Sequence, residues 1–109
     1  MAGRRLTTHV LDTARGRPAA GVAVTLRRDG EVVARAVTNA DGRTDAPLLE
    51  GADLVAGVYE LTFAVGDYFR GDGGFLDEVP VRFTVAAGAG HLHVPLLVSP
   101  GGYTTYRGS

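Results

Sequence analysis

The sequence predicts an all-β fold, a two-sheet antiparallel β-sandwich of about eight strands with at most one short helix. Three observations predict it. Apolar and polar residues alternate with a period of two along several short runs, as they do in strands with one buried face. Turn residues, chiefly Gly, Asp and Pro, separate these runs at short intervals. No apolar pattern of helical period continues far enough for a long helix.

Four strands are expected in the first half of the chain, at residues 6–13, 21–28, 31–38 and 43–48. The first carries apolar and polar residues on both faces, as a strand covered on one side by a partner subunit would. The second and third flank Asp29-Gly30, a strong hairpin signal because both turn positions tolerate positive φ. The fourth follows another Asp-Gly turn, so Arg43 stands at its start, and Pro47 closes it because proline cannot donate to a ladder.

Four more strands are expected at residues 57–65, 79–86, 91–99 and 103–107. In the first two, apolar side chains such as those of Tyr59 and Val81 alternate with polar ones. The glycine-rich stretch between these two strands breaks the rhythm and has room for one helical turn at residues 67–70. The last strand is short and rich in β-formers, so at a sheet edge it would offer its ladder groups to a second subunit.

Length and composition indicate a single domain and exclude several kinds of binding partner. A chain of 109 residues is expected to form a single domain over residues 1–109. Eleven basic and twelve acidic residues give a net charge of -1 with no run of either sign, which argues against a nucleic-acid groove or a polybasic membrane patch. The absence of cysteine suits a reducing compartment. No segment approaches the ~20 apolar residues of a membrane span, so we expect a cytoplasmic protein.

Polar residues gather in the last nineteen residues, which otherwise have the pattern of buried sheet. Along 91–99, Leu and Val occupy the even positions, whereas His91 and His93 share the odd positions and project away from the apolar stripe. In the first strand His9 shares a face with Thr7, and polarity does not distinguish its two faces. Polar groups near a core are costly without partners, so we expect the chemistry in this tail.

Three segments, supported by DEVPVRF at residues 77–83, carry a resemblance to a known family. They are LTTHVLDTARGRPAAGVAVTL from Leu6, TNADGRTDAPLL from Thr38, and HLHVPLLVSPGGYTTYRGS from His91. Over nearly the whole chain the sequence resembles the 5-hydroxyisourate hydrolases, a transthyretin-related family of urate breakdown. The final Tyr-Arg-Gly-Ser is the most specific mark and separates this family from transthyretin, the hormone carrier of the same fold.

The resemblance implies a transthyretin-like (prealbumin-like) sandwich that hydrolyses 5-hydroxyisourate to 2-oxo-4-hydroxy-4-carboxy-5-ureidoimidazoline. It implies no cofactor and no metal. It also implies a homotetramer, a dimer of dimers with the active sites at the dimer–dimer interface, and no nucleic-acid or membrane partner. The segment 70–74 looks shorter than the usual loop of the family, which puts only the geometry of a peripheral loop in question.

Where the motifs coincide, the resemblance implies a catalytic set of His9, Arg43, His93 and Ser109. The same four residues would bind the substrate, with Arg107 as a further contact. Each is placed by its motif: the histidines by LTTHVLD and HLHVPLL, the arginines by ADGR and YRGS, and the serine by the chain end.

These residue types suit the opening of a ring by water. An imidazole with a pKa near ~6.5 takes a proton from water at neutral pH, and a neighbouring guanidinium disfavours the imidazolium. His9 and His93 are the candidate base and its partner. Arg43 would clamp substrate oxygens and stabilise developing negative charge, and Ser109 would orient the water or a histidine. Water is favoured over a serine ester because no nucleophile elbow is visible.

Alternatives stay open. His91 and His93 have the His-x-His spacing, so with His9 they could bind zinc, although no carboxylate or cysteine motif supports such a site. The fold also serves non-catalytic transthyretin-like ligand carriers and prealbumin-like binding modules. The polar set of His9, Arg43, His93 and Ser109 argues against both, because neither needs it. His91 is expected to be a neighbour of the site rather than a member.

Overall fold

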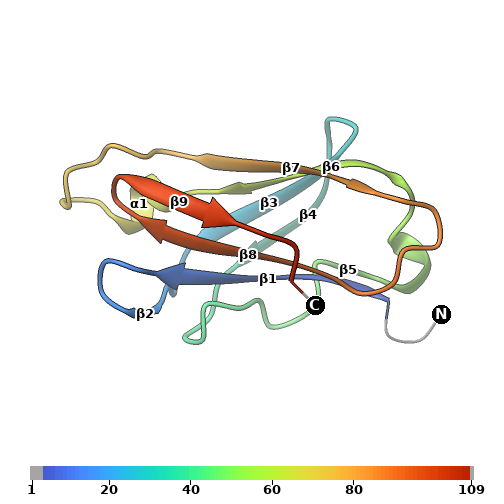
Figure 1. Cartoon of the computed structure of the whole chain (residues 1–109), viewed down its shortest axis with the longest axis horizontal. Helices are drawn as coiled ribbons and strands as arrows, with labels where there is room; N and C mark the ends of the chain where they lie inside the picture. Colours follow the sequence, from blue (N-terminus) through green and yellow to red (C-terminus); the bar gives the residue numbers. More distant parts are fainter. Residues whose placement is uncertain (1–3, 109) are drawn as a thin grey trace.

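Residues 4–108 are described by the computed structural model, in which two sheets pack face to face (Figure 1). The strands are β1 (Arg5–Asp12), β2 (Arg17–Pro18), β3 (Ala23–Arg28), β4 (Glu31–Val37), β5 (Leu49–Glu50), β6 (Gly57–Phe63), β7 (Val79–Val85), β8 (Leu92–Ser99) and β9 (Gly102–Thr105). The helical segments are a 3-10 turn, η1 (Gly51–Asp53), and a single α-helical turn, α1 (Val65–Tyr68). The predicted all-β sandwich is confirmed.

The order of the strands places β1 and β8 at the centre of one sheet. That sheet runs β2-β1-β8-β9, with β5 also paired to β1, and the other runs β4-β3-β6-β7. All strand pairs are antiparallel except β1 and β8, which are parallel, with Thr7 opposite His93. The sandwich is thus antiparallel as predicted except at this one of the described pairs. Alternation of apolar residues identifies the buried face of a strand, whereas its neighbour and direction follow from long-range packing.

The predicted strand at residues 43–48 does not form. This segment is a series of bends and turns, and only the two residues that follow it, Leu49 and Glu50, pair with β1. Pro47 lacks the N–H that a ladder needs, and Asn39 holds the preceding residues in a turn. Consequently Arg43 lies on a loop beside β1. The helical turn also differs, because α1 begins two residues before the predicted 67–70 and takes Val65 from the predicted strand.

The β3–β4 hairpin forms as the sequence predicts. Arg28 pairs with Glu31, and the two turn residues between them, Asp29 and Gly30, have φ values of 50° and 89°. Positive φ at both central residues is the requirement of a type I′ turn, whose twist matches that of the flanking strands. The hairpin lies at the end of its sheet, with β4 at the edge.

A single apolar core lies between the inner faces of the two sheets. Its largest fully buried side chains are those of Tyr59, Phe63 and Phe69. Complete burial stabilises a side chain such as Phe by roughly 1.5–3 kcal/mol. The Tyr59 hydroxyl donates a hydrogen bond of 2.7 Å to the Val55 carbonyl, so no polar atom is left unpaired there. On β8 the even-numbered residues are buried and His93 is half-exposed, which confirms the predicted orientation.

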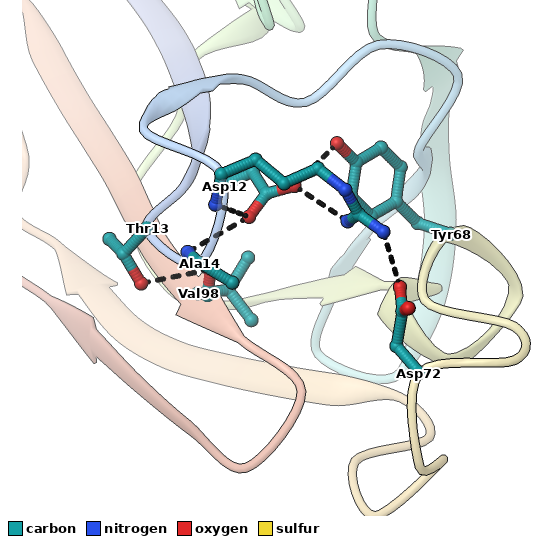
Figure 2. Close-up of polar contacts among 7 residues, drawn as sticks. Asp12, Thr13, Ala14, Tyr68, Asp72 and Val98 are labelled. Carbon is teal, nitrogen blue, oxygen red and sulfur yellow. Dashed lines mark hydrogen bonds and ion pairs between the residues drawn. The ribbon is translucent and has the colours of Figure 1, made fainter.

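A buried carboxylate, that of Asp12, joins the end of β1 to α1 and to the loop after it (Figure 2). It accepts hydrogen bonds from the backbone N–H groups of Ala14 and Arg15, each 3.0 Å, and from the Tyr68 hydroxyl at 2.8 Å. The Arg15 guanidinium bridges Asp12 and Asp72. Burial by itself would raise the pKa of Asp12, but the hydrogen bonds from Tyr68 and Arg15 outweigh it and hold the pKa below 3.8.

Candidate functional site

A cleft of about 500 Å³ opens beside β1 and β8. Thr7 and His93 stand side by side in its floor, because the parallel register pairs them on the face of the sheet that points away from the core. The loop between β4 and β5 forms the wall. The residues around the cleft are Arg5, Thr7, Thr8, Arg43, Thr44, Asp45, Ala46, Pro47, His91 and His93.

The surroundings of His93 favour the neutral form of its imidazole. Its Nδ1 lies 2.8 Å from the Thr7 hydroxyl, and the ring is half-buried. Burial lowers the pKa of His93 below the usual 6.5, and the positive charge of Arg43 lowers it further, with smaller electrostatic contributions from His9 and His91. The unprotonated imidazole therefore predominates at neutral pH, as a group that accepts a proton from water requires.

Arg43 projects into the same cleft from the loop after β4. Its backbone N–H donates to the Asn39 side-chain oxygen at 3.2 Å, and its carbonyl accepts the Asn39 N–H at 2.7 Å. The guanidinium has no hydrogen bond or ion pair to any other residue between 4 and 108. A guanidinium of this kind presents a planar set of donors to ligand oxygens.

His9 lies two residues along β1 from Thr7, on the same face of the sheet. Its Nε2 is 2.8 Å from the backbone carbonyl of Asp41. A carbonyl only accepts hydrogen bonds, so Nε2 carries the hydrogen and the lone pair of the neutral ring is on Nδ1. His9 contributes to the lowered pKa of His93 but does not line the cleft itself.

The C-terminal tail reaches the site at Gly108. The Gly108 N–H donates to the His93 carbonyl at 2.7 Å, and a Cβ at position 108 would lie 2.7 Å from Cδ2 of the His93 ring. Arg107 lines a different groove, between β7, β8 and the tail. Ser109 lies outside the described residues. The structure thus brings His93 and Arg43 together in one cleft with His9 beside it, and it separates Arg107 from them.

The zinc alternative needed His9, His91 and His93 to converge. Within the part of the chain that the structure describes, no group of three or more His, Cys, Asp or Glu side chains is arranged to hold a metal ion. His91 is exposed at the rim of the cleft. The same described residues contain no helix that is long and apolar enough to span a membrane.

Several residues of the site were not predicted from the sequence. The alternation along β1 does show that Thr7 faces the same way as His9. Its contact with His93, however, depends on the β1–β8 register. Arg5 and Asp45 add one charge of each sign to the cleft. Asn39 organises the loop that carries Arg43. The one sequence signal for this loop is the Asp41-Gly42 pair, which predicts a turn just before Arg43.

Comparison with known proteins identifies what this architecture resembles. The model of the HIUase/Transthyretin family matches residues 6–108. A 5-hydroxyisourate hydrolase of Deinococcus radiodurans is 60% identical, with 95% of each chain covered. One from Mesorhizobium japonicum is 59% identical, with 98% of this chain and 94% of the relative covered.

Solved structures agree with the sequence comparison. A 5-hydroxyisourate hydrolase of Klebsiella pneumoniae superposes with a TM-score of 0.85 at 44% identity, with 97% and 99% of the two chains covered. An (S)-allantoin synthase reaches a TM-score of 0.89 at 43% identity over 96% of this chain, which spans 43% of that longer chain. Sea bream transthyretin in complex with thyroxine gives 0.86 at 31% identity, with 95% and 94% covered. This chain belongs to the HIUase/Transthyretin family.

Proposed function

We propose that this protein hydrolyses 5-hydroxyisourate to 2-oxo-4-hydroxy-4-carboxy-5-ureidoimidazoline, a step of purine (urate) catabolism. The observation that carries the proposal is the polar cleft that both His93 and Arg43 line, in which the pKa of His93 is lowered. That pair supplies a base and a fixed positive charge, which hydrolysis of a ring amide needs. Relatives at 60% and 59% identity that are named as this hydrolase support the same substrate.

The proposed reaction is attack of water on a ring carbonyl. His93 takes a proton from the water as its oxygen bonds to the carbonyl carbon, and Arg43 stabilises the negative charge on the carbonyl oxygen. The ring C–N bond then breaks, and the proton passes from the imidazolium to the leaving nitrogen. The products are a ureido group and a carboxylic acid, which releases its proton to solvent and becomes a carboxylate, with no electron transfer and no covalent enzyme intermediate.

The other site residues receive supporting roles in this proposal. Thr7 fixes the ring of His93 through Nδ1, which leaves Nε2 for the water. His9 offers its Nδ1 lone pair to a water or to a substrate N–H group. Ser109 and Arg107, placed by their motif alone, would contact the substrate from the tail. No metal or cofactor takes part.

A carrier function is supported less well. Transthyretin shares the fold at a TM-score of 0.86, but its identity of 31% is far below that of the hydrolases, and fold alone does not decide function. The cleft holds two arginines, an aspartate and two histidines. A site for an aromatic ligand would be expected to present mainly apolar side chains.

The active form in this proposal is a homotetramer, a dimer of dimers with the sites at the dimer–dimer interface, in the cytoplasm. The β9 strand ends its sheet, so its outer ladder groups are available to a second chain. Tyr103 and Tyr106 on and beside this edge are 45% and 58% exposed. Sedimentation equilibrium should give a mass of four chains.

The direct test is the decay of freshly generated 5-hydroxyisourate, followed by ultraviolet absorbance. Catalytic amounts of the protein should accelerate the decay far beyond the rate in buffer and yield the ureidoimidazoline. Decay no faster than in buffer would reject the proposal.

A further inference from the structure

One side chain, that of Asn39, organises the loop that carries Arg43. Its Oδ1 accepts the backbone N–H groups of Asp41 and Arg43, at 2.9 and 3.2 Å. Its backbone N–H donates to the Arg43 carbonyl at 2.7 Å, and its own carbonyl accepts the Gly42 N–H at 2.9 Å. Four hydrogen bonds therefore close residues 39–43 into a single turn, and Asn39 takes part in each of them.

The same turn is docked on β1 next to His9. The Gly42 carbonyl accepts the Val10 N–H at 2.8 Å, and the Asp41 carbonyl accepts the Nε2–H of His9, also at 2.8 Å. Position 42 has φ of +74°, and a Cβ there would lie 2.3 Å from the Val10 carbonyl oxygen. The turn thus occupies a close-fitting position on the strand, and it fixes the His9 ring as well as the start of the Arg43 side chain.

The side-chain amide of Asn39 also binds the carboxylate of Asp45 in the cleft wall. Its Nδ2 donates to the Asp45 carboxylate at 2.9 Å. Asp45 lines the cleft two residues after Arg43, where its carboxylate would otherwise be available to neutralise the guanidinium. An aspartate at position 39 would keep the acceptor for the two N–H groups but would repel Asp45. Asparagine supplies both the acceptor and the donor without adding charge.

We propose that Asn39 is a positioning residue for the hydrolysis: through the turn 39–43 it holds Arg43, the His9 ring and Asp45 in one arrangement. The inference rests on the proposed function and names a residue outside the set His9, Arg43, His93, Arg107 and Ser109. Asn39 itself does not line the cleft, so its effect passes through these neighbours. A misplacement of about 1 Å at a reacting group is enough to cost on the order of 10²-fold in rate.

The experiment compares Asn39→Ala, Asn39→Asp and the exchange Asn39→Asp/Asp45→Asn by the ultraviolet assay. Asn39→Ala should lose about tenfold or more in kcat/KM. Asn39→Asp should lose a similar amount, and the exchange should recover most of it because an amide and a carboxylate again face each other. Asp29→Ala is the matched control: it alters the turn of the β3–β4 hairpin, and kcat/KM should stay at the wild-type value.

A second readout does not depend on activity. The chain has three histidines, so the imidazole nitrogens can be assigned by ¹⁵N NMR with single replacements. Neutral His9 should carry its hydrogen on Nε2 in the wild type and in the Asp29→Ala control, and should become a mixture of tautomers in Asn39→Ala.

Wild-type kcat/KM in a folded Asn39→Ala, or an unchanged His9 tautomer, would overturn the inference. Failure of the exchange to recover activity lost in Asn39→Asp would also overturn it. An inactive wild type would instead reject the proposed function, and the NMR comparison would still test the positioning by Asn39.

Discussion

At the scale of single residues, the site depends on the charge state of His93. Burial and the nearby Arg43 guanidinium both disfavour the imidazolium, so the ring stays ready to accept a proton. The Thr7 hydroxyl is hydrogen-bonded to Nδ1, so in the proposed reaction Nε2 is the ring nitrogen that accepts the proton. This account makes the pH dependence of the reaction a property of one side chain.

The acid limb of kcat/KM should therefore have its midpoint below pH 6.5, the usual pKa of histidine. In the proposed reaction neutral His93 is the reactive form, and because its pKa is lowered this form is lost only as the pH falls through the lowered value. In Arg43→Gln one source of positive charge is removed, so the pKa of His93 should rise. An NMR titration of the His93 ring measures this change without activity. A wild-type midpoint above 6.5, or a fall in the variant, would contradict the assignment.

The orientation of His91 and His93 could be predicted from sequence, but the residues that they contact could not. Alternation along 91–99 correctly pointed His91 and His93 away from the core. Nothing in that alternation tells which strand lies alongside, and the parallel β1–β8 register is what places Thr7 beside His93. The lowered pKa of His93 has the same origin, because it depends on burial and on charges that are distant in sequence.

At the scale of elements, a loop that begins with the turn 39–43 takes the place of the strand that the sequence predicted at 43–48. Pro47 and the hydrogen bonds of Asn39 both oppose pairing there. The resulting loop covers the free edge of β1 between its short partners β2 and β5, at Val10. Residues 43–48 therefore form no strand, and the loop in their place carries Arg43 at the cleft.

Gly42→Ala should displace this turn. The new Cβ would meet the Val10 carbonyl at 2.3 Å in a left-handed backbone conformation, so the hydrogen bond between Val10 and Gly42 should be lost. We expect a loss of about 2 kcal/mol or more in the free energy of unfolding, measured with urea, and a large fall in kcat.

The matched control for this substitution is Gly30→Ala. Its φ of +89° is equally unfavourable, but no atom lies within 4 Å of the added Cβ. It should destabilise the protein by about 1–2 kcal/mol and leave kcat unchanged. Equal activity in the two variants would show that the turn 39–43 does not position the site.

At the scale of the whole molecule, the Asp12 cluster ties the end of β1 to α1 and to the loop after it (Figure 2). Asp12 could not be predicted from the sequence, because its burial and its contacts with Tyr68 and Arg15 depend on the folded chain. In contrast, the hairpin at Asp29 was predictable, since its signal is local.

This cluster should make the fold sensitive to acid. The pKa of Asp12 in the folded protein lies below its unfolded value of 3.8, so the stabilisation is complete above that value and is lost as the pH falls through the lowered pKa. Asp12→Asn should cost about 2 kcal/mol at pH 7, by urea unfolding, and the difference from wild type should shrink below pH 4 or so.

Asp67→Asn provides the control, because the pair between Asp67 and Arg70 has side chains that are 78% and 81% exposed. Its effect should stay within about 0.5 kcal/mol at both pH values. A constant difference between Asp12→Asn and wild type across the acid range would disprove the linkage to this carboxylate.

The central claim is that His93, without a metal ion, activates water in the cleft. The rate of 5-hydroxyisourate hydrolysis tests it most directly, measured for wild type, His93→Ala and His91→Ala before and after exhaustive chelation. We predict that chelation changes nothing, that His93→Ala loses about 10²-fold or more, and that His91→Ala loses much less. Equal losses in the two histidine variants, or loss of wild-type activity on chelation, would contradict the claim.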